Sequence, residues 1–252
     1  MIEYVEIESR KTKLRGMIHY GQGQNCIPVV IVHGYFSANR VGPQRLFFEM
    51  ANLISKGNYD VYRFDLTGMG ESDGNISDIT FDDHVEDVKN ILEYVRKIKG
   101  NVRVCTISHC LGCNITLANV IEHSEWFREI VFLAPYYTTP EIMSSFFNDD
   151  QKEQLISESY THRKGLYAHS SFFERSKQDE FMNMLRRIPV TLNVIIPEND
   201  QFIPFESNKY TFQSLKKINL TYIPFSDHNF LTTKKEVIDK VMEVLRDEYY
   251  TE

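Results

Sequence analysis

The sequence lacks any long hydrophobic run. No window of this 252-residue chain approaches 18 consecutive apolar residues, which is about the minimum that a transmembrane helix needs. Residues 1–8 carry acidic side chains where a secretory signal peptide would carry basic ones, and no apolar stretch follows them. We therefore expect neither a membrane span nor export, and a protein that stays in the cytoplasm.

Cysteine is scarce, with four residues in the whole chain. Three of them, Cys105, Cys110 and Cys113, lie close together. This is unlike the spaced cysteine framework of a small secreted domain. Reduced thiols in a cytoplasm fit this pattern better.

Long basic runs are also missing, and the net charge is -7. A chain of this kind offers little to pair with a phosphate backbone or with an anionic membrane surface. We expect no nucleic-acid partner and no membrane insertion, and the sequence leaves the oligomeric state open.

Apolar segments of moderate length dominate what is present. The hydrophobic fraction of 42% and the charged fraction of 25% are those of a globular protein. Nearly continuous apolar runs, which are typical of parallel strands covered on both faces, occupy residues 28–34, 60–66, 102–108, 129–135 and 190–197. Residues 4–9 and 14–20 alternate in character and predict an antiparallel hairpin at the sheet edge.

Helical spacing appears between these runs. From Thr80 to Lys99, apolar residues recur three and four positions apart, with Thr80 as a candidate N-cap and Gly100 as a stop. Residues 234–250 predict a second amphipathic helix. The alternation predicts an α/β fold, with a mostly parallel sheet flanked by helices.

Residues 136–187 interrupt this alternation. We expect them to form a helical cap inserted into a core domain of residues 1–135 and 188–252. The aromatic side chains of this segment suit a pocket for an apolar acyl chain, and they equally suit the packing of a cap onto the core. They are Tyr136, Tyr137, Phe146, Phe147, Tyr160, Tyr167, Phe172, Phe173 and Phe181.

The segment Ser108-His-Cys-Leu-Gly112 carries the strongest chemical signal. It follows an apolar run and precedes helical periodicity, which predicts a strand, a sharp turn and a helix. This is the layout of a nucleophile elbow, in which the nucleophile stands at the apex of a strained turn between small residues. The apex residue here is Cys110, a thiol where a serine is usual.

Four further segments resemble loops of the α/β-hydrolase fold family. They are His33-Gly-Tyr-Phe36, Asp65-Leu-Thr-Gly-Met-Gly-Glu-Ser72, Pro197-Glu-Asn-Asp-Gln-Phe-Ile-Pro204 and Ser226-Asp-His-Asn-Phe230. In that family such loops supply the oxyanion hole, close a strand, and carry the acid and the histidine. The resemblance extends from about residue 28 to about residue 231.

Within that family, residues 63–74 and 80–88 are most similar to the small bacterial cinnamoyl and feruloyl esterases. Cys110 departs from those enzymes and resembles instead the nucleophile of dienelactone hydrolases and polyhydroxyalkanoate synthases. An engineered replacement of serine by cysteine would also explain the thiol.

The resemblance implies a catalytic triad of Cys110, His228 and Asp200, in the family's order of nucleophile, acid and histidine. It also implies an oxyanion hole made by the backbone N–H groups of Tyr35 and Leu111, with no metal and no cofactor. Glu198 and Asp227 are competing acids. The reaction it implies is cleavage of an ester or thioester through an acyl group held on Cys110.

Several alternatives stay open. Because amines and thiols attack a thioester readily, the enzyme could instead be an acyltransferase, or a cyclising or editing thioesterase that acts on a carrier-bound acyl chain. A non-catalytic ligand-binding protein of the same fold is a third reading. Cys110 and Cys113 also have the spacing of a C-x-x-C redox pair, and with Cys105 and His109 they could suggest a metal site.

Overall fold

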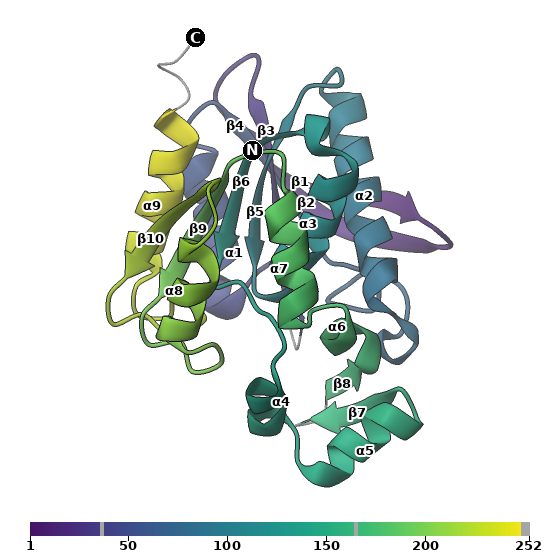
Figure 1. The fold of residues 1–252 in the computed structure, drawn as a ribbon. Coiled ribbons are helices and arrows are strands. Elements are labelled where there is room, and N and C mark those ends of the chain that lie inside the picture. Colours follow the sequence, from purple (N-terminus) through teal and green to yellow (C-terminus); the bar gives the residue numbers. More distant parts are fainter. Residues whose placement is uncertain (36–37, 164–165, 248–252) are drawn as a thin grey trace.

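The computed structural model describes residues 1–35, 38–163 and 166–247, and its centre is one eight-stranded sheet (Figure 1). The spatial order is β1-β2-β4-β3-β5-β6-β9-β10. The strands are β1 (Ile2–Ser9), β2 (Thr12–His19), β3 (Ile27–Val32), β4 (Tyr59–Phe64), β5 (Val104–His109), β6 (Phe127–Leu133), β9 (Leu192–Pro197) and β10 (Ile218–Ile223). Strand β2 pairs antiparallel with β1 and β4, and the other pairings are parallel. The predicted α/β class is confirmed.

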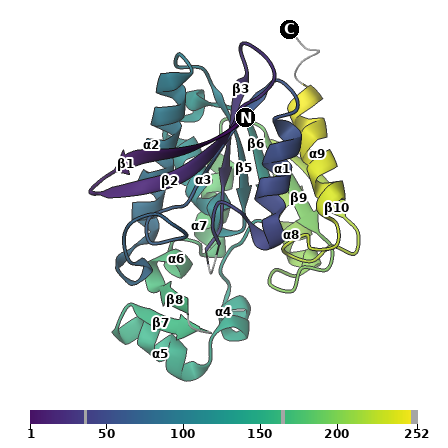
Figure 2. The ribbon, with the colours of Figure 1, turned by 180° about the vertical axis from the view of Figure 1, so that it is seen from behind.

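Helices cover both faces of the sheet. Figure 2 shows α1 (Leu46–Ile54) and α9 (Lys234–Asp247) on one face. The other face carries α2 (Phe81–Ile98), α3 (Leu111–Glu122), α7 (Gln178–Arg187) and α8 (Phe205–Gln213), as Figure 1 shows. Alternate residues of β3 serve the two layers, since Val29 and Ile31 pack with α1 and α9 while Val30 and Val32 pack with α2 and α3.

Helix α2 begins and ends where the sequence predicts. The Thr80 side chain accepts from the backbone N–H of Asp83, and the Asp83 carboxylate accepts from the N–H of Thr80, which together form a capping box. The helix closes at Lys99, and Gly100 follows with a φ of 78°, a left-handed conformation that glycine adopts at little cost.

The loop after β4 is closed on a buried carboxylate. Asp65 accepts the backbone N–H of Arg40 at 2.6 Å and that of Glu71 at 2.9 Å, and its carbonyl accepts the Ser72 hydroxyl at 2.6 Å. Gly70 has a φ of 54°, and a Cβ there would lie 2.2 Å from the Asp65 Cγ. Glycine is therefore required at position 70, because any side chain there would overlap the Asp65 carboxylate.

Residues 136–187 leave the sheet after β6 and return before β9. They form α4 (Pro140–Phe146), α5 (Asp149–Ser157), the strands β7 (Tyr160–Arg163) and β8 (Leu166–His169), α6 (Ser170–Glu174) and α7. The β7–β8 hairpin was not predicted. Thr138 bonds to Ser176 and Gln178 through its backbone N–H and C=O, at 2.7 and 3.0 Å, so the chain enters and leaves this segment side by side. The domain limits stay a prediction, because α7 packs directly on α3.

Most of the aromatic residues in this segment serve packing. Tyr136, Tyr137, Phe146, Phe147, Phe172, Phe173 and Phe181 are buried, whereas Tyr160 is exposed and Tyr167 is partly exposed. Short 3-10 turns lie at Pro43–Arg45, Ile76–Asp78 and Ser124–Trp126. In the described part of the chain, no helix combines the length and the apolarity required to span a bilayer.

Candidate active site

Cys110 stands at the junction of β5 and α3 with a strained backbone. Its φ is 55° and its ψ is -128°, a combination that a residue with a Cβ rarely adopts. Its N–H donates to the carbonyl of Leu133 at 3.1 Å, and its own carbonyl accepts from Cys113 at 3.1 Å. These bonds hold the thiol at the apex of a turn, as the elbow motif predicts.

Small residues around the turn are required by close packing. A Cβ on Gly112 would lie 2.5 Å from the carbonyl oxygen of His33, and a Cβ on Gly34 would lie 2.9 Å from the Cβ of Cys110. Ser108 occupies the position where the motif usually has glycine, and its buried hydroxyl hydrogen-bonds to that of Thr116 at 2.7 Å. The elbow accommodates this departure from the motif without an unsatisfied polar group.

His228 and Asp200 come from two loops and meet in the interior. The Nδ1–H of His228 donates to the Asp200 Oδ2 at 2.8 Å, and the two side chains are 3% and 0% exposed. The Asp200 Oδ1 accepts the backbone N–H groups of Phe202 and Ile203 at 2.8 and 3.0 Å. Bonds to both oxygens fix the carboxylate as an acceptor and orient the imidazole.

The charges around His228 favour its cationic form. Burial disfavours the cation, but the negative charges and hydrogen bonds of Cys110 and Asp200 outweigh it and raise the pKa of His228 to about 10. Cys110 is near enough to the imidazole to influence the pKa of His228, and since Nδ1 faces Asp200, Nε2 is the nitrogen left for the thiol. The arrangement suits transfer of a proton between the thiol and the imidazole.

Three neighbours of His228 were not identified from the sequence as site residues. The Nε2 of His109 lies 2.9 Å from the carbonyl oxygen of His228, and burial lowers the pKa of His109 to about 3, so a neutral ring donates from that nitrogen. Gln201 accepts the backbone N–H of His228 at 3.2 Å, and the Phe202 ring stands edge-on to the imidazole at 4.9 Å. His109 ends β5, whereas His228, Gln201 and Phe202 lie in loops that are distant from it in the chain, and no spacing in the sequence indicates these contacts.

The two predicted oxyanion donors are Leu111, the residue after Cys110, and Tyr35, the residue after the glycine that packs on Cys110. Leu111 is the first residue of α3, a position whose N–H has no partner within the helix. Tyr35 follows β3 in a loop held by His33, whose Nδ1–H donates to Gly34 at 2.8 Å and whose Nε2 accepts the Leu66 N–H at 3.1 Å. The role of these two N–H groups stays a prediction.

Cys113, the second thiol of the C-x-x-C spacing, lies in the interior. All four cysteines are free, and Cys113 is fully buried with its Sγ 3.2 Å from the carbonyl of Ser108. Burial raises the pKa of Cys113 well above its ordinary value, which disfavours a reactive thiolate. Among the residues that the structure describes, no group of three or more His, Cys, Asp or Glu side chains could hold a metal ion.

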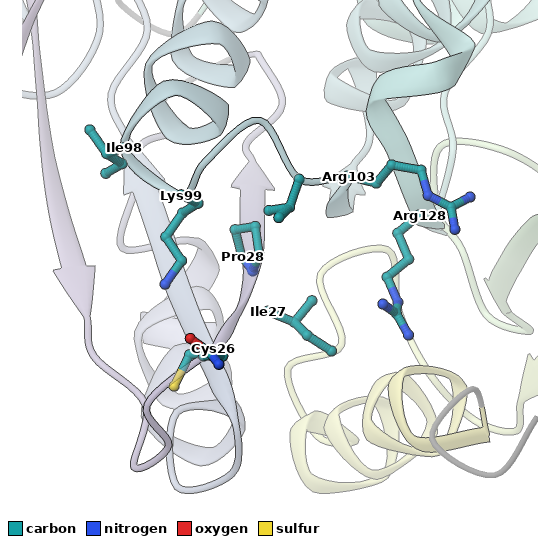
Figure 3. Close-up of a pocket in the computed structure, with 9 residues that line it drawn as sticks. Cys26, Ile27, Pro28, Ile98, Lys99, Arg103 and Arg128 are labelled. Carbon is teal, nitrogen blue, oxygen red and sulfur yellow. The ribbon is translucent and has the colours of Figure 1, made fainter. Parts of the chain in front are cut away.

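A separate cavity of about 480 Å³ lies at the amino-terminal ends of β3 and β6 (Figure 3). Lys99 lies on one side of it and Arg103 and Arg128 on the other. Lys99 is ion-paired with Asp60 at 2.8 Å. Because Cys110 follows the far end of β5, this cavity is not part of the candidate active site.

Comparison with known proteins gives one family and several structural neighbours. A family model described as serine aminopeptidase, S33, matches residues 24–152. A probable lysophospholipase of Arabidopsis thaliana, BODYGUARD 4, is 25% identical over 129 residues, which is 50% of this chain and 29% of that protein. The match thus spans less than a third of that relative.

Two solved structures share the fold of nearly the whole chain. Est1E from Butyrivibrio proteoclasticus, solved with ferulic acid bound, superposes with a TM-score of 0.83 at 16% identity, over 96% of this chain and 98% of that chain. The thioesterase domain from the curacin biosynthetic pathway superposes with a TM-score of 0.69 at 11% identity, over 96% and 99%.

Proposed function

This chain belongs to the serine aminopeptidase S33 family of α/β-hydrolases, and on that premise we propose that it cleaves an ester or thioester through an acyl group carried on Cys110. The observation that carries the proposal is the contact series from Cys110 through His228 to Asp200 at a strained turn. A thiol held beside a buried imidazole and carboxylate has the arrangement of an activated nucleophile.

In the acylation step, His228 takes the proton of the Cys110 thiol as the sulfur attacks the substrate carbonyl carbon, and the sulfur electron pair forms a C–S bond. The carbonyl oxygen becomes an oxyanion, which the N–H groups of Leu111 and Tyr35 bind, each worth about 3 kcal/mol in comparable sites. The C–O or C–S bond of the substrate then breaks. The imidazolium of His228 gives its proton to the leaving alcohol or thiol, and Asp200 stabilises the cation until that transfer.

In the deacylation step, His228 takes a proton from an incoming water as that water attacks the thioester carbon. The tetrahedral adduct collapses, the carboxylic acid leaves, and the pair of Cys110 and His228 is restored.

Acyl transfer is the second candidate function, and the thiol nucleophile favours it. A thioester reacts with amines and thiols more readily than an oxygen ester does, so a second substrate can replace water.

The acyl-enzyme is tested by incubation with p-nitrophenyl acetate followed by mass spectrometry of the intact protein and its peptides. We expect one added acetyl group on Cys110 in the wild type and none in Cys110→Ala. Cys26→Ala, a buried thiol outside the site, is the matched control and should still acylate. Absence of both adduct and turnover in the folded wild type would favour the non-catalytic alternative.

Hydrolysis and transfer are then separated by product analysis with an acyl thioester, with and without an added amine. An amide product that grows with amine concentration supports transfer, and free acid alone supports hydrolysis.

The Cys110→Ser variant tests whether the reaction needs sulfur as the nucleophile. If it raises esterase activity by orders of magnitude and loses no other activity, the mechanism through sulfur is wrong.

A further inference from the structure

Tyr35 connects the nucleophile turn to the inserted segment of residues 136–187. Its backbone neighbour Gly34 packs so closely on Cys110 that no Cβ fits between them. Its side chain reaches in another direction, and the ring stacks on Phe172 of α6 with centroids 4.0 Å apart and planes 26° apart. Tyr35 is 4% exposed and Phe172 is 0% exposed, so this contact is part of the packed interior.

A second contact joins the same two segments. The backbone N–H of His169, at the end of β8, donates to the Tyr35 hydroxyl at 3.4 Å. The His169 side chain caps α6 by accepting the N–H of Ser171 at 3.2 Å. The position of the Tyr35 ring is therefore tied to the first turn of α6.

The first turn of α6 is also held by α2. The Ser171 hydroxyl accepts the backbone N–H of Phe81 at 3.0 Å, and the Phe172 ring meets the rings of Phe81 and His84 at 6.1 and 5.1 Å. Phe172 consequently lies between Tyr35 and the start of α2. This α6 segment has one defined position relative to the core when all these contacts are made.

We propose that β8 and α6 position the oxyanion donor at Tyr35, so that Cys110 is acylated only while this segment is seated on the core. This inference rests on the proposed function. Displacement of α6 would release the Tyr35 ring and with it the adjoining backbone at Gly34, which packs against Cys110. Because a 1 Å misplacement in a catalytic site can cost about 10²-fold in rate, a loosened Tyr35 would slow acylation while leaving the thiol and His228 in place. Phe172 and His169 are thus positioning residues.

The test compares two reactions of the same thiol. Acylation by p-nitrophenyl acetate develops an oxyanion, whereas alkylation by iodoacetamide displaces iodide and develops none. In Phe172→Ala we expect acylation to slow by about 10- to 100-fold, below the ~10²- to 10³-fold loss of a whole oxyanion donor. Alkylation should stay within about two-fold, because Cys110 and His228 keep their geometry.

Two further variants serve as controls. Phe173→Ala removes a buried ring of equal size from the same helix, one that packs at 5.1 Å from Phe147, and it should keep the wild-type ratio of the two rates. Tyr35→Phe keeps the stacked ring and loses only the hydroxyl that accepts from His169, so its acylation should fall less than that of Phe172→Ala. Tyr35→Phe also carries the test if Phe172→Ala does not fold.

Each result has a defined meaning. If acylation and alkylation slow equally in Phe172→Ala, and Phe173→Ala shows the same equal loss, then α6 only stabilises the fold and the inference is overturned. Unchanged acylation in folded Phe172→Ala, or in Tyr35→Phe where it alone folds, would also overturn it. If the wild type is alkylated but forms no acyl adduct, the proposed function fails first and this inference fails with it.

Discussion

At the scale of single residues, the raised pKa of His228 makes stability depend on pH. The folded-state pKa of about 10 lies above the ordinary value of 6.5. The stabilisation that comes from this group is therefore complete below pH 6.5 and disappears as the pH rises through about 10. We expect the free energy of unfolding, measured by urea denaturation, to decrease across that interval.

The Cys110→Ala variant provides the comparison. The charge of Cys110 is the foremost of the influences that raise the pKa of His228, so its removal should flatten the decrease between pH 6.5 and 10. Titrating groups other than His228 and Cys110 are common to both proteins, so their contributions cancel in the difference. Parallel curves for wild type and variant would show that the thiol and the imidazole are not electrostatically coupled.

Some residues of the candidate active site are marked by a local pattern in the sequence, and others are not. Cys110 stands out because the elbow is a strand, a turn and a helix within a few residues, and Gly112 marks the close approach to β3. His228 and Asp200 stand out by resemblance to the family's loops. His109 belongs to the elbow, yet its bond to the carbonyl of His228 joins residues far apart in the chain, and no spacing indicates that bond.

At the scale of elements, the packing of α3 against β3 depends on Gly112. A Cβ there would meet backbone oxygens of His33 at 2.5 Å and of Val32 at 2.8 Å, neither of which can move as a flexible side chain does. We expect Gly112→Ala to lower the free energy of unfolding by about 1–3 kcal/mol, the usual range for overpacking. Denaturant unfolding measures this directly.

A glycine with space around it is the control for that change. At Gly57 the nearest atom to an added Cβ would be the carbonyl oxygen of Ile54 at 3.4 Å, an ordinary contact. Gly57→Ala should therefore stay within about 0.5 kcal/mol of the wild type. Equal stability of the two variants would mean that α3 can shift away from β3 without loss.

The elements that the sequence predicts are those whose signals are local. The five buried parallel strands have continuous apolar runs, and the capping box of α2 lies within four consecutive residues, so each is visible in one short window. Strand β10 was not predicted because it lies at the sheet edge and is only partly buried, and its mixed sequence includes Asn219. The β7–β8 hairpin was also missed, since its strands are short and, in the described part of the chain, form a separate two-stranded sheet.

At the scale of the whole molecule, the carboxylate of Asp87 joins three segments that are distant in the chain. It lies on α2 with no exposed surface. It accepts the Ser9 hydroxyl at 2.6 Å and the Arg10 guanidinium at 3.2 Å from the β1–β2 hairpin, and the Thr67 N–H at 2.9 Å from the loop after β4. Thr67 follows Leu66, which bonds to His33 beside the oxyanion loop.

Removal of this carboxylate should loosen both the hairpin and the site. Breaking a buried ion pair by removing one partner costs about 3–5 kcal/mol, and because Arg10 is 28% exposed we expect about 3 kcal/mol for Asp87→Ala. Asp87→Asn keeps an oxygen acceptor and should lose less. Acylation by p-nitrophenyl acetate should slow in the alanine variant as well, because the loop beside His33 loses its anchor. A stability loss below about 1 kcal/mol, with unchanged acylation, would show that the hairpin and the site are held independently of Asp87.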